Sequence, residues 1–389
     1  MKKLLFDIDI LLNSQGKETG VCRVCLQILK ELSKRCEYEI YPLVSFHTDV
    51  NVKKYLSSKE LDILANKIVY MPHLKATCGG IKRKYGIKAK ILKFLCGKKY
   101  KKELKKYDEY ISIFSPISSL VLESGLKTRL FIHDLFPINF PEACNKKFIQ
   151  KYTHWMQMAN TDEFICVSQS TQADFLKFRP DIHPSKTKVV YLAADERFES
   201  TPNPKIKEKY DIKTPKYFLG VSDHNPRKNF PHLIQSFIEF VKSQKISDIS
   251  LVLVGPKKQF NEIEELVGNL KELKDKIILT GFVPDEDLPA LYTEAELFIY
   301  PSLFEGFGLP VLEAMQCGTP VLTCDNTSLP EVGGDAVEYI SGKDISETVQ
   351  KMAELHQNSN KLKQMSSAGL KRAQQFSWAK TVNQIFNLK

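Results

Sequence analysis

The second half of the chain alternates short apolar runs with stretches of helical spacing, and this alternation restricts the fold more than any other feature. The apolar runs cover 217–221, 250–255, 276–282, 297–301, 321–324 and 336–340. Helical spacing covers 231–242, 261–273, 287–295, 309–317 and 346–358. Continuous apolar strands separated by helices are typical of a parallel sheet that is covered by helices on both faces. The pattern therefore predicts an α/β fold with a doubly wound sheet.

The first half shows the same alternation less cleanly. Its expected strands are 3–12, 39–45, 68–71, 110–114, 129–134, 163–167 and 188–192, with a helix over 19–34. A polar segment with two prolines, 198–204, is typical of a linker. We therefore expect two Rossmann-like domains, 1–198 and 205–376, followed by a short amphipathic helix at 377–389. Ligands of such sheets bind at the carboxyl ends of the strands.

Composition indicates a globular protein rather than a disordered or membrane-spanning one. The 389 residues are 43% hydrophobic and 26% charged, and no apolar run approaches the ~20 residues of a transmembrane helix. Asp7 and Asp9 interrupt the apolar N-terminus, which therefore resembles a first strand more than a signal peptide. Nine scattered cysteines, an odd number, favour reduced thiols and a cytoplasmic location.

Positive charge is concentrated in one segment. The chain carries a net charge of +10, and the stretch 75–106 contains twelve Lys, one Arg and one Glu. Ile87, Ile91 and Leu95 recur at helical spacing within it, so the stretch fits a basic amphipathic helix on an anionic membrane surface. The solvated face of an ordinary helix explains the pattern equally well. Nucleic-acid binding is a weaker interpretation, because no aromatic side chains are interleaved as a stacking platform.

The segment after the apolar run 297–300 carries the clearest chemistry. A glycine-rich turn from Glu305 to Gly308 opens a helix at Leu309, and its first turn tolerates Pro310. Backbone amides at such a helix N-terminus attract phosphate. Glu305 and Glu313 point toward the same region, where carboxylates are useful only as acceptors for sugar or ribose hydroxyls. A ligand with phosphates and many hydroxyls is a nucleotide sugar.

The motif Glu305-x7-Glu313 within E-G-F-G-L-P-V-L-E-A resembles the signature of the retaining glycosyltransferases of family 4. The resemblance implies the GT-B fold, in which two Rossmann-like domains face each other across a cleft, the N-terminal one binding the acceptor and the C-terminal one the nucleotide sugar. It also implies that the last helix, 377–389, crosses back to the first domain. It implies transfer of a hexose from a UDP- or GDP-sugar, with GDP-mannose favoured by likeness to mannosyltransferases. The acceptor would be a glycan or a lipid-linked glycan in surface polysaccharide assembly. No cofactor and no metal are expected, since Lys, Arg and a helix dipole supply the positive charge.

The same resemblance assigns roles to individual residues. Lys228 would hold the donor phosphates with Arg227 beside it, Glu305 would bind sugar hydroxyls and Glu313 the ribose. His133 would face the transferred sugar. Further donor-binding residues are Gly306, Phe307, Gly308 and Leu309 at the phosphates, Phe282 and Val283 at the nucleobase, and Gly20 and Ser168 near the sugar, with Gly16 beside Gly20. The sequence lacks the arginine that some relatives place directly after Gly220, and Arg227 is the candidate to replace it.

Other functions stay open at this point. A metal-dependent glycosyltransferase would use a D-x-D motif, which Asp7-x-Asp9 and Asp285-x-Asp287 match formally. The first pair falls in the expected opening strand, and the second starts a helix, where acidic residues are common. A nucleotide-sugar epimerase of similar fold, or a non-catalytic protein that binds glycan or nucleic acid, are the remaining alternatives. For the enzyme, we expect a cytoplasmic location, peripheral on the inner face of the cytoplasmic membrane.

Overall fold

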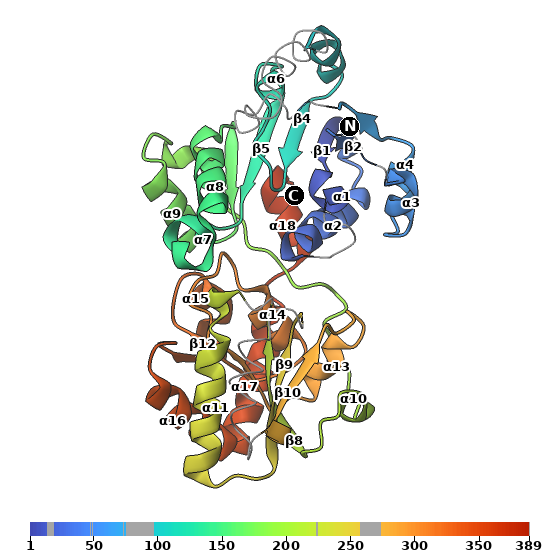
Figure 1. The fold of residues 1–389 in the computed structure, drawn as a ribbon. Helices are drawn as coiled ribbons and strands as arrows, with labels where there is room; N and C mark the ends of the chain where they lie inside the picture. Colours follow the sequence, from blue (N-terminus) through green and yellow to red (C-terminus); the bar gives the residue numbers. More distant parts are fainter. Residues whose placement is uncertain are drawn as a thin grey trace. The chain divides into compact units, whose positions relative to one another are not determined.

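The computed structural model describes residues 1–13, 19–46, 48, 50–72, 74, 97–222, 225–256 and 274–388. The chain forms two compact units, one of Met1–Leu192 with Trp378–Lys389 and one of Ala193–Ser377 (Figure 1). Three expectations lie outside the described residues: the helix at 261–273, the approach of Gly16, and the amphipathic pattern at 87–95.

The N-terminal unit is built on a seven-stranded parallel sheet in the order β3-β2-β1-β4-β5-β6-β7. Its strands are β1 Lys2–Asp7, β2 Tyr38–Val44, β3 Val69–Tyr70, β4 Glu109–Ser112, β5 Lys127–Ile132, β6 Glu163–Cys166 and β7 Thr187–Val189. Its helices are α1 Asp9–Asn13, α2 Gly20–Ser33, α3 Val52–Ser57, α4 Asp62–Ala65, α6 Ser119–Leu122, α7 Phe136–Asn139, α8 Lys146–Met158, α9 Gln169–Phe178 and α18 Trp378–Phe386, with 3-10 turns at Pro141–Ala143 and Pro184–Lys186.

The C-terminal unit contains a six-stranded parallel sheet in the order β10-β9-β8-β11-β12-β13. Its strands are β8 Lys216–Val221, β9 Ile249–Val254, β10 Ile277–Gly281, β11 Leu297–Tyr300, β12 Val321–Cys324 and β13 Glu338–Ile340. Its helices are α10 Lys205–Lys209, α11 Phe230–Gln244, α13 Leu288–Thr293, α14 Leu309–Gln316, α15 Leu329–Gly333, α16 Ile345–His356 and α17 Ser359–Ala373, with 3-10 turns η5 Pro226–Lys228, η7 Lys274–Lys276 and η8 Gly334–Ala336.

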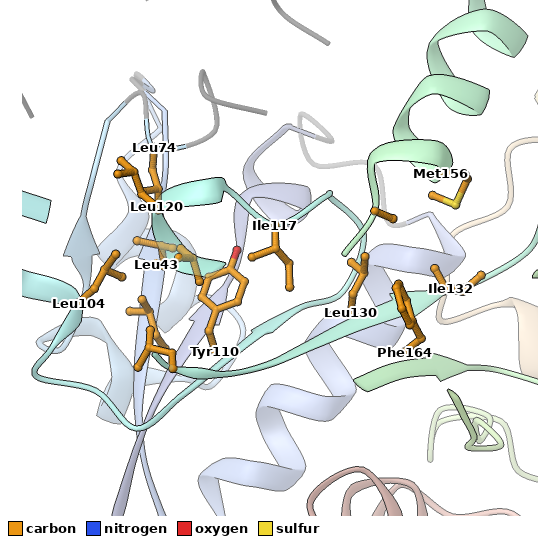
Figure 2. Packing of buried hydrophobic residues seen from close by; sticks show 14 of the residues in the cluster. Leu43, Leu74, Leu104, Tyr110, Ile117, Leu120, Leu130, Ile132, Met156 and Phe164 are labelled. Atoms are coloured by element: carbon orange, nitrogen blue, oxygen red, sulfur yellow. The ribbon is translucent and has the colours of Figure 1, made fainter. Parts of the chain in front are cut away.

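Both sheets are buried because their strands carry apolar side chains on both faces. All six residues of β9 and all four of β11 are buried. In the N-terminal unit, buried side chains of the strands and the helices form one cluster. Figure 2 shows Ile132 and Phe164 toward Met156 of α8, and Tyr110 toward Leu43 at the other end of the cluster. Burial of this kind, at roughly 25 cal/mol per Å², is the main stabilising contribution in such a layer. Each unit therefore has a hydrophobic core of its own.

The last helix, α18, belongs to the N-terminal unit although it follows the C-terminal one in sequence. The Phe386 ring lies 4.8 Å from the Tyr38 ring, centroid to centroid, and the Arg129 guanidinium lies 4.9 Å from its centroid. Arg129 is fully buried and is ion-paired to Glu109 and Glu163. The helix is thus held by a buried ionic cluster as well as by apolar contacts.

Two expected boundaries differ from the structure. β1 ends at Asp7 rather than continuing to Leu12, and α1 begins at Asp9, because the Asp7 carboxylate accepts a hydrogen bond from the Asp9 backbone N–H. Phe198, which we expected at the end of the N-terminal domain, lies in the C-terminal unit with its ring 5.9 Å from the Tyr292 ring. Among the described residues, no helix is both long and apolar enough to cross a membrane.

Candidate functional site

The C-terminal sheet has a switch point between β8 and β11. These strands are hydrogen-bonded neighbours, but the chain proceeds from β8 toward one edge of the sheet and from β11 toward the other. In doubly wound folds ligands bind at this point, beside the carboxyl ends of the two strands. The loop at 225–229 follows β8 and the loop at 301–308 follows β11, so both candidate motifs occupy this position.

Main-chain and hydroxyl contacts tie the two loops together. The Leu303 N–H donates to the Arg227 carbonyl at 2.7 Å, and the Ser302 hydroxyl oxygen lies 3.2 Å from the same carbonyl oxygen. Arg227 in turn donates from Nη1 to the Phe304 carbonyl at 2.7 Å. The basic pair and the glycine-rich turn therefore form one connected site.

Arg227 and Lys228 both bind the Glu305 carboxylate. Lys228 Nζ lies 2.6 Å from Oε1, and Arg227 Nη1 lies 2.9 Å from Oε2. Two hydroxyls reach the same group, that of Tyr300 at 2.8 Å and that of Ser302 at 2.5 Å, both donating to Oε1. Glu305 is 7% exposed, so this cluster is almost completely removed from water.

The partners of Glu305 keep it ionised despite its burial. Burial alone would raise the pKa of the Glu305 carboxyl, but the charges of Arg227 and Lys228, with hydrogen bonds from Lys228 and Ser302, lower it to about 2. Both of its oxygens are occupied by side chains of this unit. We expected Glu305 to bind sugar hydroxyls directly, but in the structure its carboxylate is already paired with Arg227 and Lys228.

Helix α14 begins directly after this cluster. Gly308, the residue that caps it, has φ +112°, and a Cβ there would lie 3.0 Å from Leu329 Cδ2. The Ser328 hydroxyl donates to the carbonyls of Glu305 and Phe307 at 3.0 and 2.8 Å, which fixes the turn around Gly306. The first residue of the helix is Leu309, so the positive end of α14 lies at the switch point.

Glu313 lies on the second turn of α14 and is buried, with 4% exposure. The Tyr292 hydroxyl of α13 donates to its Oε2 at 3.3 Å. At the end of β10, Val283 is buried whereas Phe282 is 78% exposed. An aromatic ring with this exposure can stack against a flat ligand such as a nucleobase.

His133 lies at the carboxyl end of β5 in the N-terminal unit. Its Nε2 lies 2.7 Å from the Ile113 carbonyl oxygen, to which it donates, and its ring stacks on Phe131 at 5.8 Å. Burial lowers the pKa of His133 to about 4, although the Ile113 carbonyl favours the charged form. The ring is therefore neutral at pH 7, and Nδ1, with no partner among the residues of the described ranges, carries a lone pair that accepts hydrogen bonds.

The other expected residues of the N-terminal unit differ in their environments. Gly20 is the first residue of α2, and a Cβ there would lie more than 4 Å from every atom of the described residues apart from its chain neighbours and its own helix. Ser168 is fully buried and caps α9 by accepting from the Thr171 N–H at 3.0 Å. In this arrangement the Ser168 hydroxyl stabilises a helix and is closed to a ligand.

Asp195 lies in the C-terminal unit, where it accepts from Arg197 Nη2 at 3.0 Å, while Arg197 Nη1 binds Asp285 at 2.9 Å. Asp287 accepts from the Tyr210 hydroxyl at 2.6 Å. Asp285 and Asp287, the second D-x-D match, are therefore both hydrogen-bonded to side chains of this unit.

The first D-x-D pair is buried. Asp7 accepts from the Tyr110 hydroxyl at 3.0 Å, and Asp9 accepts from the Ser45 N–H at 2.9 Å. Both carboxylates are 3% exposed. Asp7 therefore links β1 to β4, the two strands at the switch point of the N-terminal sheet, and Asp9 links α1 to the residue after β2.

Sequence reasoning missed Tyr300 and Ser302. In the sequence, Tyr300 lies in an apolar run, and Ser302 lies between that run and the glycine-rich turn. In the structure both side chains are fully buried, and both hydroxyls donate to the Glu305 carboxylate. The signal in the sequence was their position at the end of the predicted strand that directly precedes the Glu305 motif.

Comparison with known proteins agrees with this site. Residues 202–372, which include every member of the Glu305 cluster, match the family described as Glycosyl transferases group 1. The O-antigen chain mannosyltransferase B of Escherichia coli is 35% identical over 182 residues, covering 47% of this chain and 48% of that protein. The O-antigen chain mannosyltransferase RfbU of Salmonella typhimurium is 28% identical over 213 residues, covering 55% of this chain and 56% of that protein. The matches thus span about half the length of these two relatives.

Solved structures show the fold over the whole chain. Anabaena HepE, solved in complex with UDP and glucose, superposes with a TM-score of 0.73 at 18% identity, covering 100% of this chain and 99% of HepE. WaaG, a glycosyltransferase of lipopolysaccharide biosynthesis, superposes with a TM-score of 0.68 at 16% identity, covering 99% of each chain. The fold is GT-B, with two parallel-sheet α/β units, and the C-terminal unit resembles the family Glycosyl transferases group 1 over residues 202–372.

Proposed function

We propose that this protein is a retaining glycosyltransferase that moves a hexose from a nucleoside-diphosphate sugar to a glycan or lipid-linked acceptor. The observation that carries the proposal is the site at the β8–β11 switch point, where Arg227, Lys228 and the N-terminus of α14 converge. Two cations and a helix dipole suit a diphosphate leaving group and need no metal ion to supply positive charge.

The donor is a hexose nucleotide, and GDP-mannose is the favoured candidate. The curated relatives that match this site are named mannosyltransferases of O-antigen chains. The structural neighbour HepE was solved with UDP, which supports a nucleoside diphosphate as the leaving group without deciding the base. Phe282 would lie against that base, with Val283 beneath it, and Glu313 would accept from the ribose hydroxyls. The relatives' names also support a role in surface polysaccharide assembly.

The reaction joins an acceptor hydroxyl to the anomeric carbon on the face from which the diphosphate departs. The bond between the anomeric carbon and the diphosphate oxygen breaks, a bond to the acceptor oxygen forms, and a β-phosphate oxygen takes the acceptor proton. Lys228, Arg227 and the α14 terminus stabilise the charge that develops on the departing nucleoside diphosphate. Neutral His133, with an accepting Nδ1, would bind a hydroxyl of the transferred sugar.

The part of the basic stretch that the structure describes supports a membrane-facing role. Lys98, Lys99, Lys102 and Lys105 are exposed, and none of them is paired with another described side chain. Each such lysine contributes about 1 kcal/mol at an anionic bilayer. We place the enzyme in the cytoplasm, in peripheral contact with the inner face of the membrane. Sedimentation with vesicles of neutral and of anionic lipid tests this, and binding that ignores lipid charge contradicts it.

The reaction is tested by following UDP- and GDP-hexoses by NMR in the presence of the enzyme, with water as the default acceptor. We expect release of the nucleoside diphosphate, and an α-linked donor should first yield the α-anomer of the sugar. An epimerase would invert a carbon of the sugar without breaking its bond to the nucleotide. A binding protein would leave the nucleotide sugar unchanged.

The Lys228→Ala variant connects this turnover to the site. We expect its rate to fall at least 100-fold, a loss of roughly 3 kcal/mol of transition-state stabilisation. Lys361→Ala is the matched control, because Lys361 forms a 2.7 Å ion pair with Glu338 in the same unit, outside the cluster. Equal turnover by both variants and the wild type would refute the assignment of the site.

A further inference from the structure

Glu305 is ion-paired with both of the cations that the donor needs. Lys228 and Arg227 contact its oxygens at 2.6 and 2.9 Å in a buried site. The phosphate oxygens of a nucleoside diphosphate compete with this carboxylate for the same two cations. A buried carboxylate that loses its counter-ion is strongly destabilised unless other donors remain.

Tyr300 and Ser302 are donors that remain. Both side chains are fully buried, both hydroxyls donate to Glu305 Oε1, and neither is a cation that a phosphate would attract. The Tyr300 ring stacks on Phe298 at 5.7 Å, and its backbone carbonyl accepts from the Thr323 hydroxyl at 2.8 Å. Its hydroxyl is therefore held in place by the sheet, independently of where Lys228 points.

Tyr300 also contacts Lys228 itself. Lys228 Nζ donates to the Tyr300 hydroxyl, and the ammonium lies 5.1 Å from the centroid of the ring. One hydroxyl thus accepts from the cation and donates to the carboxylate. This position lets Tyr300 keep contact with both groups while the distance between them changes.

We propose that Tyr300 and Ser302 are positioning residues that hold Glu305 ionised and in place while Lys228 and Arg227 turn to the donor diphosphate. The inference rests on the proposed function, since it needs a diphosphate ligand at this site. It also gives Glu305 a role other than direct sugar binding, as the anion that keeps the two cations ordered before the donor arrives.

The proposal has a consequence for protons. Among the described residues, the charged and titratable groups that contact the Glu305 side chain are Arg227 and Lys228 from η5 and Tyr300 from β11. The loop after β12 contributes two hydroxyls: that of Thr327 accepts from the Glu305 N–H, and that of Ser328 contacts backbone carbonyls of the turn. When a cation moves to the diphosphate, the pKa of Glu305 rises from its low value, and the two hydroxyls limit that rise. Removing a hydroxyl should therefore increase proton uptake on ligand binding.

Calorimetry measures this directly. We would titrate UDP and GDP into the wild type, Tyr300→Phe and Ser302→Ala at about pH 5.5, in two buffers of different ionisation enthalpy, so that proton uptake is obtained with the affinity. We expect each variant to bind about tenfold more weakly, the scale of one lost hydrogen bond to a charged group, and to take up more protons than the wild type. Protonation of the free nucleotide is common to all proteins and cancels in the comparison.

Tyr217→Phe is the matched control. Tyr217 is fully buried on the neighbouring strand β8, and its hydroxyl donates to the Leu291 carbonyl at 2.6 Å, away from the Glu305 cluster. Wild-type affinity and proton uptake in Tyr217→Phe, with both changed in Tyr300→Phe, would establish the role. Ser302→Ala carries the test if Tyr300→Phe does not fold.

Two results would overturn the inference. One is unchanged affinity and proton uptake in Tyr300→Phe and Ser302→Ala, and the other is an equal change in Tyr217→Phe. If the wild type binds neither UDP nor GDP, the proposed function fails, and this inference fails with it. The wild-type titration therefore separates the failure of the two proposals.

Discussion

At the scale of single residues, the site depends on a buried carboxylate with two cationic neighbours. Glu305 and Lys228 could be named from the sequence because the motif and the loop position point to them. Their mutual ion pair could not, because a sequence does not show which of two opposite charges on different loops will meet. Tyr300 and Ser302 escaped notice for a related reason, since hydroxyls at a strand end are common and become informative only when their partner is known.

The low pKa of Glu305 makes folding stability depend on pH. The folded pKa of about 2 lies below the ordinary value of 4.5, so this carboxylate stabilises the fold fully above about pH 4.5. That contribution, about 3 kcal/mol for such a shift, is lost as the pH falls from 4.5 through 2. Urea unfolding of the wild type and Glu305→Gln should show a difference that shrinks over this range. A difference independent of pH would contradict the assignment.

His133 should remain neutral well below pH 7. Burial lowers its pKa to about 4, so the imidazole ring should titrate more than a unit below the ordinary 6.5. Nitrogen chemical shifts recorded against pH would give the value, and the ring should carry its proton on Nε2, which faces the Ile113 carbonyl. A midpoint near 6.5, or a proton on Nδ1, would remove the basis for an accepting Nδ1.

At the scale of elements, the strands of the C-terminal unit could be predicted, because each strand is a continuous apolar run, and so could helices α11, α13, α14 and α16. The run at 321–324 coincides with β12, and the helix expected at 309–317 is α14, Leu309–Gln316. Helix α17 was missed, because its buried positions include Gly369 and Ala373, small residues that carry little apolar signal. In the N-terminal unit, β1 was expected too long, because Asp7 and Asp9 were interpreted as interruptions of one strand and not as its end.

Two glycines at helix starts should respond oppositely to alanine. Gly308→Ala places a Cβ 3.0 Å from Leu329 Cδ2 at φ +112°, so it should destabilise the C-terminal unit by 1 kcal/mol or more, an order-of-magnitude figure. The Cβ of Gly20→Ala meets no atom of the residues that the structure describes within 4 Å, so the substitution should leave stability unchanged or slightly higher. If the backbone at Gly20 faces the donor, turnover falls in Gly20→Ala all the same. Thermal unfolding and turnover, measured on the same variants, separate an effect on stability from an effect on the reaction. A destabilised Gly20→Ala would contradict the open space at the Gly20 Cα.

At the scale of the whole molecule, the sequence predicted two α/β units joined by a polar segment, and the structure has two units with the last helix in the first of them. The site residues divide between these units, with the phosphate-binding candidates in the C-terminal one and His133 and Gly20 in the N-terminal one. The docking of α18 was an expectation from family resemblance alone. Its cause is visible only in the structure, where Arg129, Glu109 and Phe386 come from three distant parts of the chain.

The N-terminal unit should therefore depend on the end of the chain. Phe386 is 5% exposed and packs against Tyr38 and the Arg129 guanidinium, so Phe386→Ala should destabilise this unit by roughly 3–5 kcal/mol. Leu370→Ala is the control, because Leu370 is 38% exposed on α17 of the other unit and should change little. Hydrogen exchange followed by mass spectrometry should show faster exchange in β1, β2 and β4 of Phe386→Ala. Unchanged exchange there would show that α18 does not stabilise the sheet.

The central claim is that the cationic site at the β8–β11 switch point binds the diphosphate of an activated sugar. Isothermal calorimetry of UDP and GDP with the wild type and Lys228→Ala tests it most directly. We expect the wild type to bind at least one of the two nucleotides, and Lys228→Ala to bind it at least tenfold more weakly, the loss expected for a charge-assisted contact to phosphate. Absence of binding by the wild type, or equal affinity of the two proteins, would contradict the claim.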